Sequence, residues 1–167
     1  MNENGKTTVE LEEVKQVTLD LQEAVIRLKA QLSSSPNSTT LKELEEIVSS
    51  PTTTLLVARK CNDTTRIEHT FGTKTKRIVG MLTLVILRLP TGIRAWIEDV
   101  VVDQQERGNN VGRLLVKEAI SKAAASGAIN IDLTSRPSRQ AANHLYSSLG
   151  FVIRDTNVYR LEIRKDQ

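Results

Sequence analysis

Gly108 and Gly112 lie in a short polar turn between an apolar run, Val100 to Val102, and a segment with helical apolar spacing that begins at Val111. This order predicts a buried strand, a turn and a helix in immediate succession. The first turn of a helix leaves backbone amides without intrahelical acceptors, and the helix dipole adds partial positive charge there. Such a turn can hold a phosphate without a charged side chain. The alternative is a turn that only packs the strand against the helix.

Two ionisable side chains also occupy informative positions. Glu98 stands next to Trp96 and Ile97, where a carboxylate is costly unless it is paired or faces a cavity. Strand alternation turns Asp99 to the opposite face, and a β-bulge would exchange the two. Either carboxylate could equally pair with a basic residue on a neighbouring strand. Tyr146 falls on the apolar side of a predicted helix, where a core tyrosine would need only a partner for its hydroxyl.

Strands and helices alternate around these residues. Asp20 with Glu23, and Thr40 with Glu43, form capping boxes that predict the starts of two helices. Further helices are expected from Val111 and from Pro137, ending at glycines 127 and 150. Apolar and β-branched runs predict strands at residues 8–17, 55–59, 78–87, 95–102 and 129–133, and a closing hairpin of residues 151–154 and 158–163. The strand, helix and strand over residues 95–133 imply parallel pairing.

Composition limits the class of protein. The chain has 167 residues, 39% hydrophobic and 26% charged, which favours one globular domain over residues 1–167, with residues 1–8 expected to be flexible. There is no apolar run of about 18 residues and no secretory pattern at the start, so we expect a cytoplasmic protein without membrane contact. A single cysteine excludes an intrachain disulfide, and two distant histidines predict no metal site.

Charge is distributed unevenly along the chain. Residues 1–50 carry 5 basic and 9 acidic groups, whereas residues 51–167 carry 18 basic and 11 acidic groups. The second part is therefore positive by 7 charges, which favours a polyanionic ligand near the glycine turn. The basic residues are scattered singly and aromatic residues are only 3% of the chain, so nucleic acid is not the expected partner.

Two motifs resemble those of the GNAT superfamily of acyl-CoA N-acyltransferases, and the resemblance covers roughly residues 10–163. The family turn has Arg or Gln, two variable residues, Gly, one variable residue, then Gly or Ala; here Arg107 begins it and Gly112 ends it. Asn110 replaces the middle glycine, and asparagine is among the residues that best tolerate left-handed dihedral angles. The run from Ala142 to Phe151 is similar to the family stretch that carries a tyrosine.

The resemblance implies an α/β fold (α+β, three layers), with a mixed, splayed sheet of six to seven strands flanked by four helices. It implies that amides from Gly108 to Gly112 hold the pyrophosphate of coenzyme A, and that Val100 and Val102 pair their backbone with pantetheine. Ser135 could bond pantetheine or cap a helix, and Arg139 could reach a phosphate or stay solvated. The implied cofactor-binding set is Val100, Val101, Val102, Arg107, Gly108, Asn109, Asn110, Val111, Gly112, Arg113, Ser135 and Arg139.

The resemblance also assigns the proton transfers. Tyr146 matches the family's general acid, which would protonate the departing thiolate. An amine substrate is mostly protonated at neutral pH, so a base is required, and Glu98 is our candidate, with Asp99 or water as alternatives.

Together these features predict an N-acetyltransferase that uses acetyl-CoA. A primary amine, in a small molecule or a peptide, would attack the thioester directly. The amine itself cannot be identified from the fold, and a homodimer is compatible with the size. The alternative is a non-catalytic acyl-CoA-binding sensor or interaction module. A nucleic-acid module is a third and weaker one.

Overall fold

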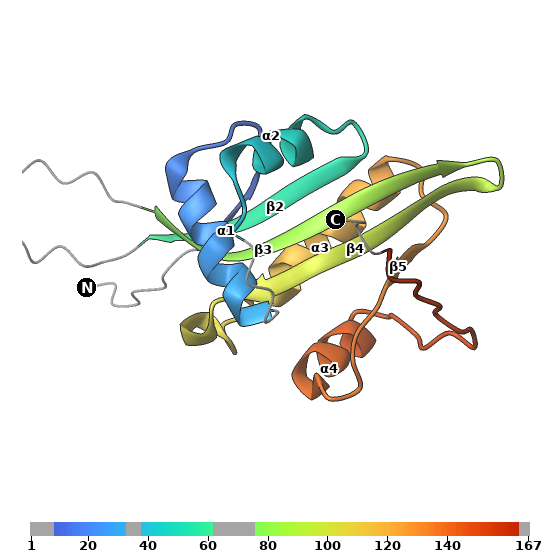
Figure 1. Cartoon of the computed structure of the whole chain (residues 1–167). Helices are drawn as coiled ribbons and strands as arrows, with labels where there is room; N and C mark the ends of the chain where they lie inside the picture. Colours follow the sequence, from blue (N-terminus) through green and yellow to red (C-terminus); the bar gives the residue numbers. More distant parts are fainter. Residues whose placement is uncertain (1–8, 33–37, 62–75, 164–167) are drawn as a thin grey trace, which may run out of the picture. The chain divides into compact units, whose positions relative to one another are not determined.

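Aliphatic and β-branched residues form a five-stranded sheet in the computed structural model, which describes residues 9–32, 38–61 and 76–163 (Figure 1). The strands lie in chain order: β1 (Val9–Glu13), β2 (Thr53–Cys61), β3 (Lys76–Leu89), β4 (Gly92–Val102) and β5 (Ile131–Leu133). The first four pair antiparallel, and β5 pairs parallel to β4 as predicted. The predicted flexible start and residues 62–75 of the polar connection lie outside the described residues.

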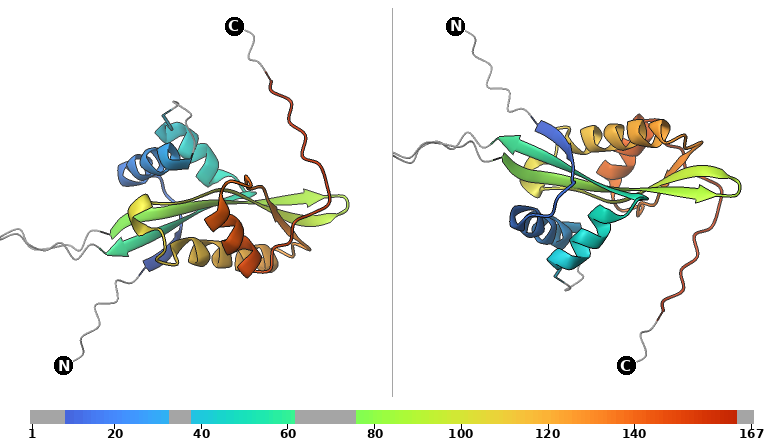
Figure 2. Two further views of the ribbon diagram at one scale, coloured as in Figure 1. Left: turned by 90° about the horizontal axis from the view of Figure 1, so that it is seen from below. Right: turned by 90° about the horizontal axis from the view of Figure 1, so that it is seen from above.

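The described residues contain four α-helices besides the sheet, so the predicted α+β fold with a mixed sheet is confirmed. They are α1 (Leu19–Leu32), α2 (Leu41–Ser49), α3 (Val111–Ala125) and α4 (Gln140–Ser148). Helices α1 and α2 cover one face of the sheet, and α3 covers the other (Figure 2). The chain divides into two compact units, Met1–Thr134 and Ser135–Gln167, and α4 belongs to the second. The expectation of a single domain stays a prediction.

The predicted sheet of six to seven strands is wrong for the described residues, because the closing hairpin is absent. Residues 151–163 contain no strand. Phe151 is half-buried, but the other apolar side chains of this segment are exposed, and Ile153 and Tyr159 are 101% and 89% exposed. The alternation of apolar and polar residues is a local signal, whereas a strand also requires a partner edge for its backbone groups.

Capping decides where the first two helices begin. Glu43 N donates to Thr40 Oγ1 at 3.2 Å and Thr40 N donates to Glu43 Oε2 at 2.8 Å, which confirms the predicted capping box of α2. The predicted box at Asp20 is wrong. Leu21 N donates to Thr18 Oγ1 at 3.2 Å, so α1 starts earlier, and Asp20 instead accepts a bond from Arg59 at 2.8 Å.

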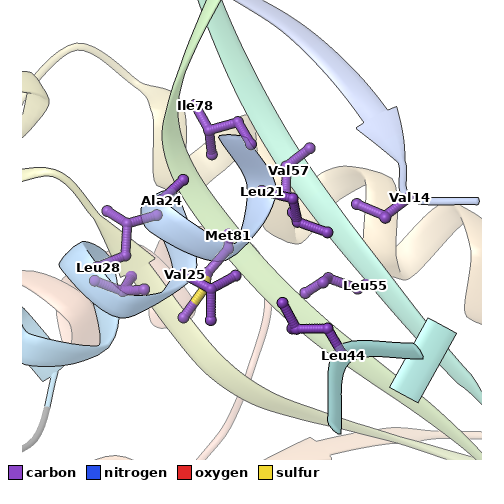
Figure 3. Close-up of a cluster of buried hydrophobic side chains, with 11 residues drawn as sticks. Val14, Leu21, Ala24, Val25, Leu28, Leu44, Leu55, Val57, Ile78 and Met81 are labelled. Atoms are coloured by element: carbon purple, nitrogen blue, oxygen red, sulfur yellow. The ribbon is translucent and has the colours of Figure 1, made fainter. Parts of the chain in front are cut away.

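The core between the sheet and α1 and α2 is built from apolar side chains on one face of α1. Leu21, Val25 and Leu28 are buried against side chains of β2 and β3, and Leu44 of α2 joins them (Figure 3). On the opposite face, most of the buried side chains of α3 follow a spacing of four residues, whereas Leu114 is 37% exposed. The buried side chains of α3 are Val111, Leu115, Val116, Ala119 and Ala123.

Gly80 allows α3 to approach the sheet closely. A Cβ at this position of β3 would lie 3.1 Å from Leu115 Cδ1, 3.1 Å from Val111 Cγ1 and 3.2 Å from the carbonyl oxygen of Val101. The first turns of α3 therefore pack on a β3 backbone that carries no side chain there. This contact fixes the height of the α3 N-terminus above the sheet.

We expect Gly80→Val to lower the free energy of unfolding by about 1–3 kcal/mol, because the added methyl groups overpack this contact. Gly80→Ala is expected to have a smaller effect of the same sign. Urea denaturation followed by circular dichroism measures both. A Gly80→Val variant with the wild-type midpoint would show that α3 can move away from the sheet without cost.

Candidate functional site

A β-bulge interrupts β4 shortly before its end. Thr83 pairs with Glu98 and Met81 with Val101, so Asp99 and Val100 together oppose the single residue Leu82. Asp99 has a positive φ of 50°. A bulge bends its strand and shifts the alternation of backbone and side-chain directions by one residue. The bulge that was left open in the sequence analysis is thus present.

Beyond the bulge, β4 offers a backbone edge that no described strand pairs with. Strand β5 pairs with β4 only at Ala95, Trp96 and Ile97. Asp103 N donates to the carbonyl oxygen of Val79 at 2.8 Å, so Asp103 directs its backbone toward β3. Alternation then directs the backbone of Val102 and Val100 toward the other edge.

The three valines at residues 100–102 therefore direct their backbone groups to different edges of β4. The carbonyl oxygen of Val102 accepts from Arg107 Nε at 3.4 Å, which agrees with its outward direction. Val101 lies in the core with Met81 and directs its backbone toward β3. The backbone groups of Val100 and Val102 are thus placed to pair with an extended ligand, whereas Val101 holds the strand against β3 and the core.

The turn after β4 leads into α3 through two residues with positive φ. A short 3₁₀ turn, η1 (Gln104–Glu106), is followed by Gly108 with φ 83° and by Asn110 with φ 61°. Asn110 is the N-cap of α3 and makes no side-chain capping bond. The first intrahelical bond runs from Leu114 N to the carbonyl oxygen of Asn110 at 3.0 Å. Asn110 thus adopts the left-handed conformation that asparagine tolerates better than most residues.

Helix geometry gives the start of α3 the properties of an anion site. The amides of Val111 and Gly112 precede the first intrahelical bond, so the helix supplies no acceptor for them. Gly112 and Arg113 are half-buried in this first turn, whereas Arg107, Gly108 and Asn109 are exposed. The predicted phosphate-holding residues are therefore contiguous with the β4 edge.

Asp103 anchors the beginning of the turn, and the sequence analysis did not single it out. Its carboxylate is buried and accepts hydrogen bonds from Arg27 of α1, from Arg77 of β3 at 2.8 Å and from Gln105 N at 3.2 Å. An open pocket beside it is lined by Arg27, Gln31, Arg77, Asp103, Gln104 and Gln105. The sequence signal that could have identified Asp103 was its position directly after an apolar strand. Its partners, far away in the chain, could not be read from the sequence.

Glu106 anchors the middle of the turn. Lys60 Nζ of β2 donates to both of its carboxylate oxygens at 2.8 Å, and Asn109 Nδ2 donates to Oε2 at 3.1 Å. The bond from Lys60 is the main cause that lowers the pKa of Glu106 below its ordinary value. The carboxylate therefore stays ionised at neutral pH.

Glu98, the predicted base, is exposed rather than enclosed by its apolar neighbours. It accepts a hydrogen bond from Trp96 Nε1 at 2.6 Å. Cross-strand partners share a face, so Glu98 lies with Thr83 on the sheet face that α1 and α2 partly cover. Asp99, the alternative base, is exposed at the bulge.

The second unit contains the predicted acid. Tyr146 is half-buried in α4, and its ring meets Phe151 edge-on, with centroids 5.9 Å apart at 65°. Burial raises the pKa of the Tyr146 hydroxyl, and the charge of Arg139 opposes this shift. The phenol is therefore protonated at neutral pH, which a proton donor requires.

Ser135 and Arg139 of the same unit differ in their surroundings. Ser135 Oγ is buried and makes no hydrogen bond with a described residue. A buried hydroxyl in this state suits a ligand that supplies the partner. Arg139 is exposed at the N-cap of α4.

Two other kinds of site have no support in the described residues. None of the helices described has the length and apolar character needed to cross a membrane. Within the same residues, no group of three or more His, Cys, Asp or Glu side chains could hold a metal ion.

Comparison with known proteins gives one sequence family. The model of the acetyltransferase (GNAT) family matches residues 38–151, which include β2 to β5, the turn, α3 and α4. No curated protein matches the chain significantly.

Solved structures share the fold at low sequence identity. A Trypanosoma brucei acetyltransferase is 22% identical, with a TM-score of 0.70 over 93% of this chain and 100% of that chain. Glucosamine-6-phosphate N-acetyltransferase from Arabidopsis thaliana is 20% identical, with a TM-score of 0.70 over 92% of this chain and 98% of that chain. An aminoglycoside acetyltransferase from an uncultured soil metagenomic sample is 17% identical, with a TM-score of 0.74 over 94% and 97%.

The left-handed conformation of Asn110 restricts which side chains are tolerated at the N-cap of α3. We expect Asn110→Gly to retain wild-type stability and Asn110→Val to lose about 1–2 kcal/mol, because a β-branched residue at positive φ brings Cβ too close to the backbone. Chemical denaturation measures both. Asn130→Val, at an exposed position without positive φ, is the control. Equal losses for the variants at residues 110 and 130 would contradict the assignment.

Acid should release the bonds made by Glu106 and Glu13. Lys60 lowers the pKa of Glu106, and Lys122 followed by Lys15 lowers that of Glu13, both from 4.5. The unfolded chain then binds more protons, so this stability is present above about pH 4.5 and is lost as pH falls through the lowered folded pKa. Urea midpoints measured between about pH 6 and 3 should fall less in Glu106→Gln than in the wild type. Ser147→Ala, which alters no titratable group, should retain the wild-type slope, and an equal slope in Glu106→Gln would count against the linkage.

Proposed function

The chain belongs to the acetyltransferase (GNAT) family, and from this we propose that it is an N-acetyltransferase that transfers an acetyl group from acetyl-CoA to a primary amine. One observation carries the proposal. The β4 edge that no described strand pairs with, at Val100 and Val102, runs directly into a turn that ends at the N-terminus of α3. A linear ligand with an amide-bearing arm and a pyrophosphate matches this order of groups.

The residues present fit such a ligand along its length. The backbone of Val100 and Val102 can pair with the pantetheine amides, with Val101 holding the strand in the core. The amides from Gly108 to Gly112 can bind the pyrophosphate, helped by the dipole of α3. The rest of the proposed set is Arg107, Asn109, Asn110, Val111, Arg113, Ser135 and Arg139. Each unit has its own sign of fit: Asn110 is left-handed in the first, and in the second Ser135 Oγ is buried without a hydrogen-bond partner among the described residues.

Acetyl-CoA supplies the activated acetyl thioester when it is bound. A backbone amide at the edge beyond the bulge would donate to the thioester carbonyl, where negative charge develops. Tyr146, protonated at neutral pH, would give its proton to the departing sulfur. Glu98 would take a proton from the attacking amine, directly or through water, and its exposure leaves it open to both routes.

The acceptor is proposed only as a class. The similar structures include enzymes named for aminoglycosides and for glucosamine-6-phosphate, which are amines of different charge. The described residues of this chain single out no particular amine.

A non-catalytic acyl-CoA-binding module is the second candidate. The observation that favours it is the position of Glu98, which is exposed and bonded to Trp96 rather than held in an enclosed site. Such a module would use the same turn and the same edge of β4, but it would need neither Tyr146 as an acid nor Glu98 as a base.

Calorimetric titration with acetyl-CoA, and separately with ATP, tests the proposal first. We expect micromolar binding of acetyl-CoA and none of ATP, because the β4 edge recognises the pantetheine arm that ATP lacks. No binding of acetyl-CoA at millimolar concentration would overturn both candidates.

Substitution of the proton carriers then separates the candidates. With an amine panel and detection of the released thiol, Tyr146→Phe and Glu98→Gln should each lower turnover about 100-fold or more. Their affinity for acetyl-CoA should stay near that of the wild type. Tyr159→Phe, 89% exposed, and Glu45→Gln, exposed on α2, are the matched controls. Wild-type turnover in Tyr146→Phe would exclude it as the acid, and no turnover with any amine would favour the binding module.

A further inference from the structure

Glu106 stands inside the turn that we propose to hold the pyrophosphate, although a carboxylate there should repel a phosphate. Its side chain is directed to Lys60 of β2, whose Nζ lies 2.8 Å from each carboxylate oxygen. The two side chains are 22% and 13% exposed. This ion pair is therefore partly shielded from solvent, where charges interact more strongly than at an open surface.

The same carboxylate organises the next part of the turn. Asn109 Nδ2 donates to Glu106 Oε2 at 3.1 Å, and Asn109 N donates to the carbonyl oxygen of Glu106 at 3.3 Å. Asn109 lies between Gly108 and Asn110, the two positions with positive φ. Two hydrogen bonds to Glu106 thus hold Asn109, the residue between these two positions. We call this set, Lys60, Glu106 and Asn109, the turn clamp.

Charge and geometry in the clamp depend on each other. With Lys60 present, Glu106 can orient Asn109 while its charge is balanced. Without Lys60, an unbalanced carboxylate would face the phosphate site. Asp103, the other acid at this turn, has Arg27 and Arg77 as partners, so it does not compete with Glu106 for Lys60.

We propose that Lys60 and Glu106 are positioning residues for the phosphate-holding turn, and that Lys60 acts by cancelling the charge of Glu106 rather than by contacting the ligand. This inference rests on the proposed function, since it takes coenzyme A as the ligand. It predicts a defect confined to the phosphorylated part of the ligand. It also predicts that removal of both charges is less harmful than removal of Lys60 alone.

The experiment compares Lys60→Met, Glu106→Gln and the double variant. Coenzyme A binding is measured by calorimetry, and pantetheine, which lacks the phosphates, by NMR titration. We expect Lys60→Met to weaken coenzyme A binding about 10-fold, Glu106→Gln about 3-fold, and the double variant no more than Glu106→Gln. Added salt should reduce the defect of Lys60→Met, and pantetheine affinity should stay within about twofold throughout. Lys122→Met, which removes a bond to Glu13 of comparable exposure, is the matched control and should bind both ligands normally.

Each other outcome overturns the inference. Wild-type binding of coenzyme A by Lys60→Met, or an equal loss of coenzyme A and pantetheine, would exclude a role at the phosphates while the proposed function stands. A double variant weaker than Lys60→Met would show that Lys60 contacts the ligand itself. Failure of the wild-type protein to bind coenzyme A would instead remove the proposed function and this inference together. Circular dichroism melts confirm that each variant is folded.

Discussion

A β-strand can direct the backbone groups of only every second residue to a given edge, and the site of this protein depends on how β4 meets that constraint. Ahead of the bulge, Ala95 N donates to Asn130 at 3.0 Å on the β5 side. Beyond the bulge, the residues that face that side are Val100 and Val102. Because of the extra residue at the bulge, β4 pairs with β3 in one register before Asp99 and in another after it. The side chain of Val101 lies in the core.

The same strand fixes where the turn that we propose to bind an anion can lie. Asp103 continues β4 by one bond to Val79 and then ends it, because its buried carboxylate is held by arginines from α1 and β3. Without these arginines the buried carboxylate would be left as an uncompensated charge, so the two ion pairs hold this end of the strand in place. On the other side of the turn, Gly80 allows α3 to pack close to β3. The N-terminus of α3 is therefore placed by packing, not by the turn residues alone.

Much of this arrangement could be predicted from local sequence, and the failures have a common cause. The turn, the left-handed Asn110 and the α2 capping box depend on residues adjacent in the chain, where glycine, asparagine and threonine have strong conformational preferences. Other features depend on distant partners. Thr18 rather than Asp20 caps α1, since Asp20 accepts a hydrogen bond from Arg59. Residues 151–163, predicted as a hairpin, pair with no strand among the described residues, and Glu98 is exposed. Asp103 and Glu106 acquire their roles only from cations on other elements.

That last dependence explains how an anion site can contain two carboxylates. Acidic side chains are stabilised near a helix N-terminus by the same dipole that attracts a phosphate, so Asp103 and Glu106 would compete with the ligand. Each is instead paired with cations from neighbouring elements, Asp103 with Arg27 and Arg77 and Glu106 with Lys60, so the two negative charges are balanced. In the proposed site, attraction over distance would come from the net charge of +7 of residues 51–167, and short-range recognition would come from backbone amides. Amides have fixed directions, so a site of this kind selects its ligand by the spacing of acceptor groups more than by charge, which suits a long ligand with amides at one end and phosphates at the other.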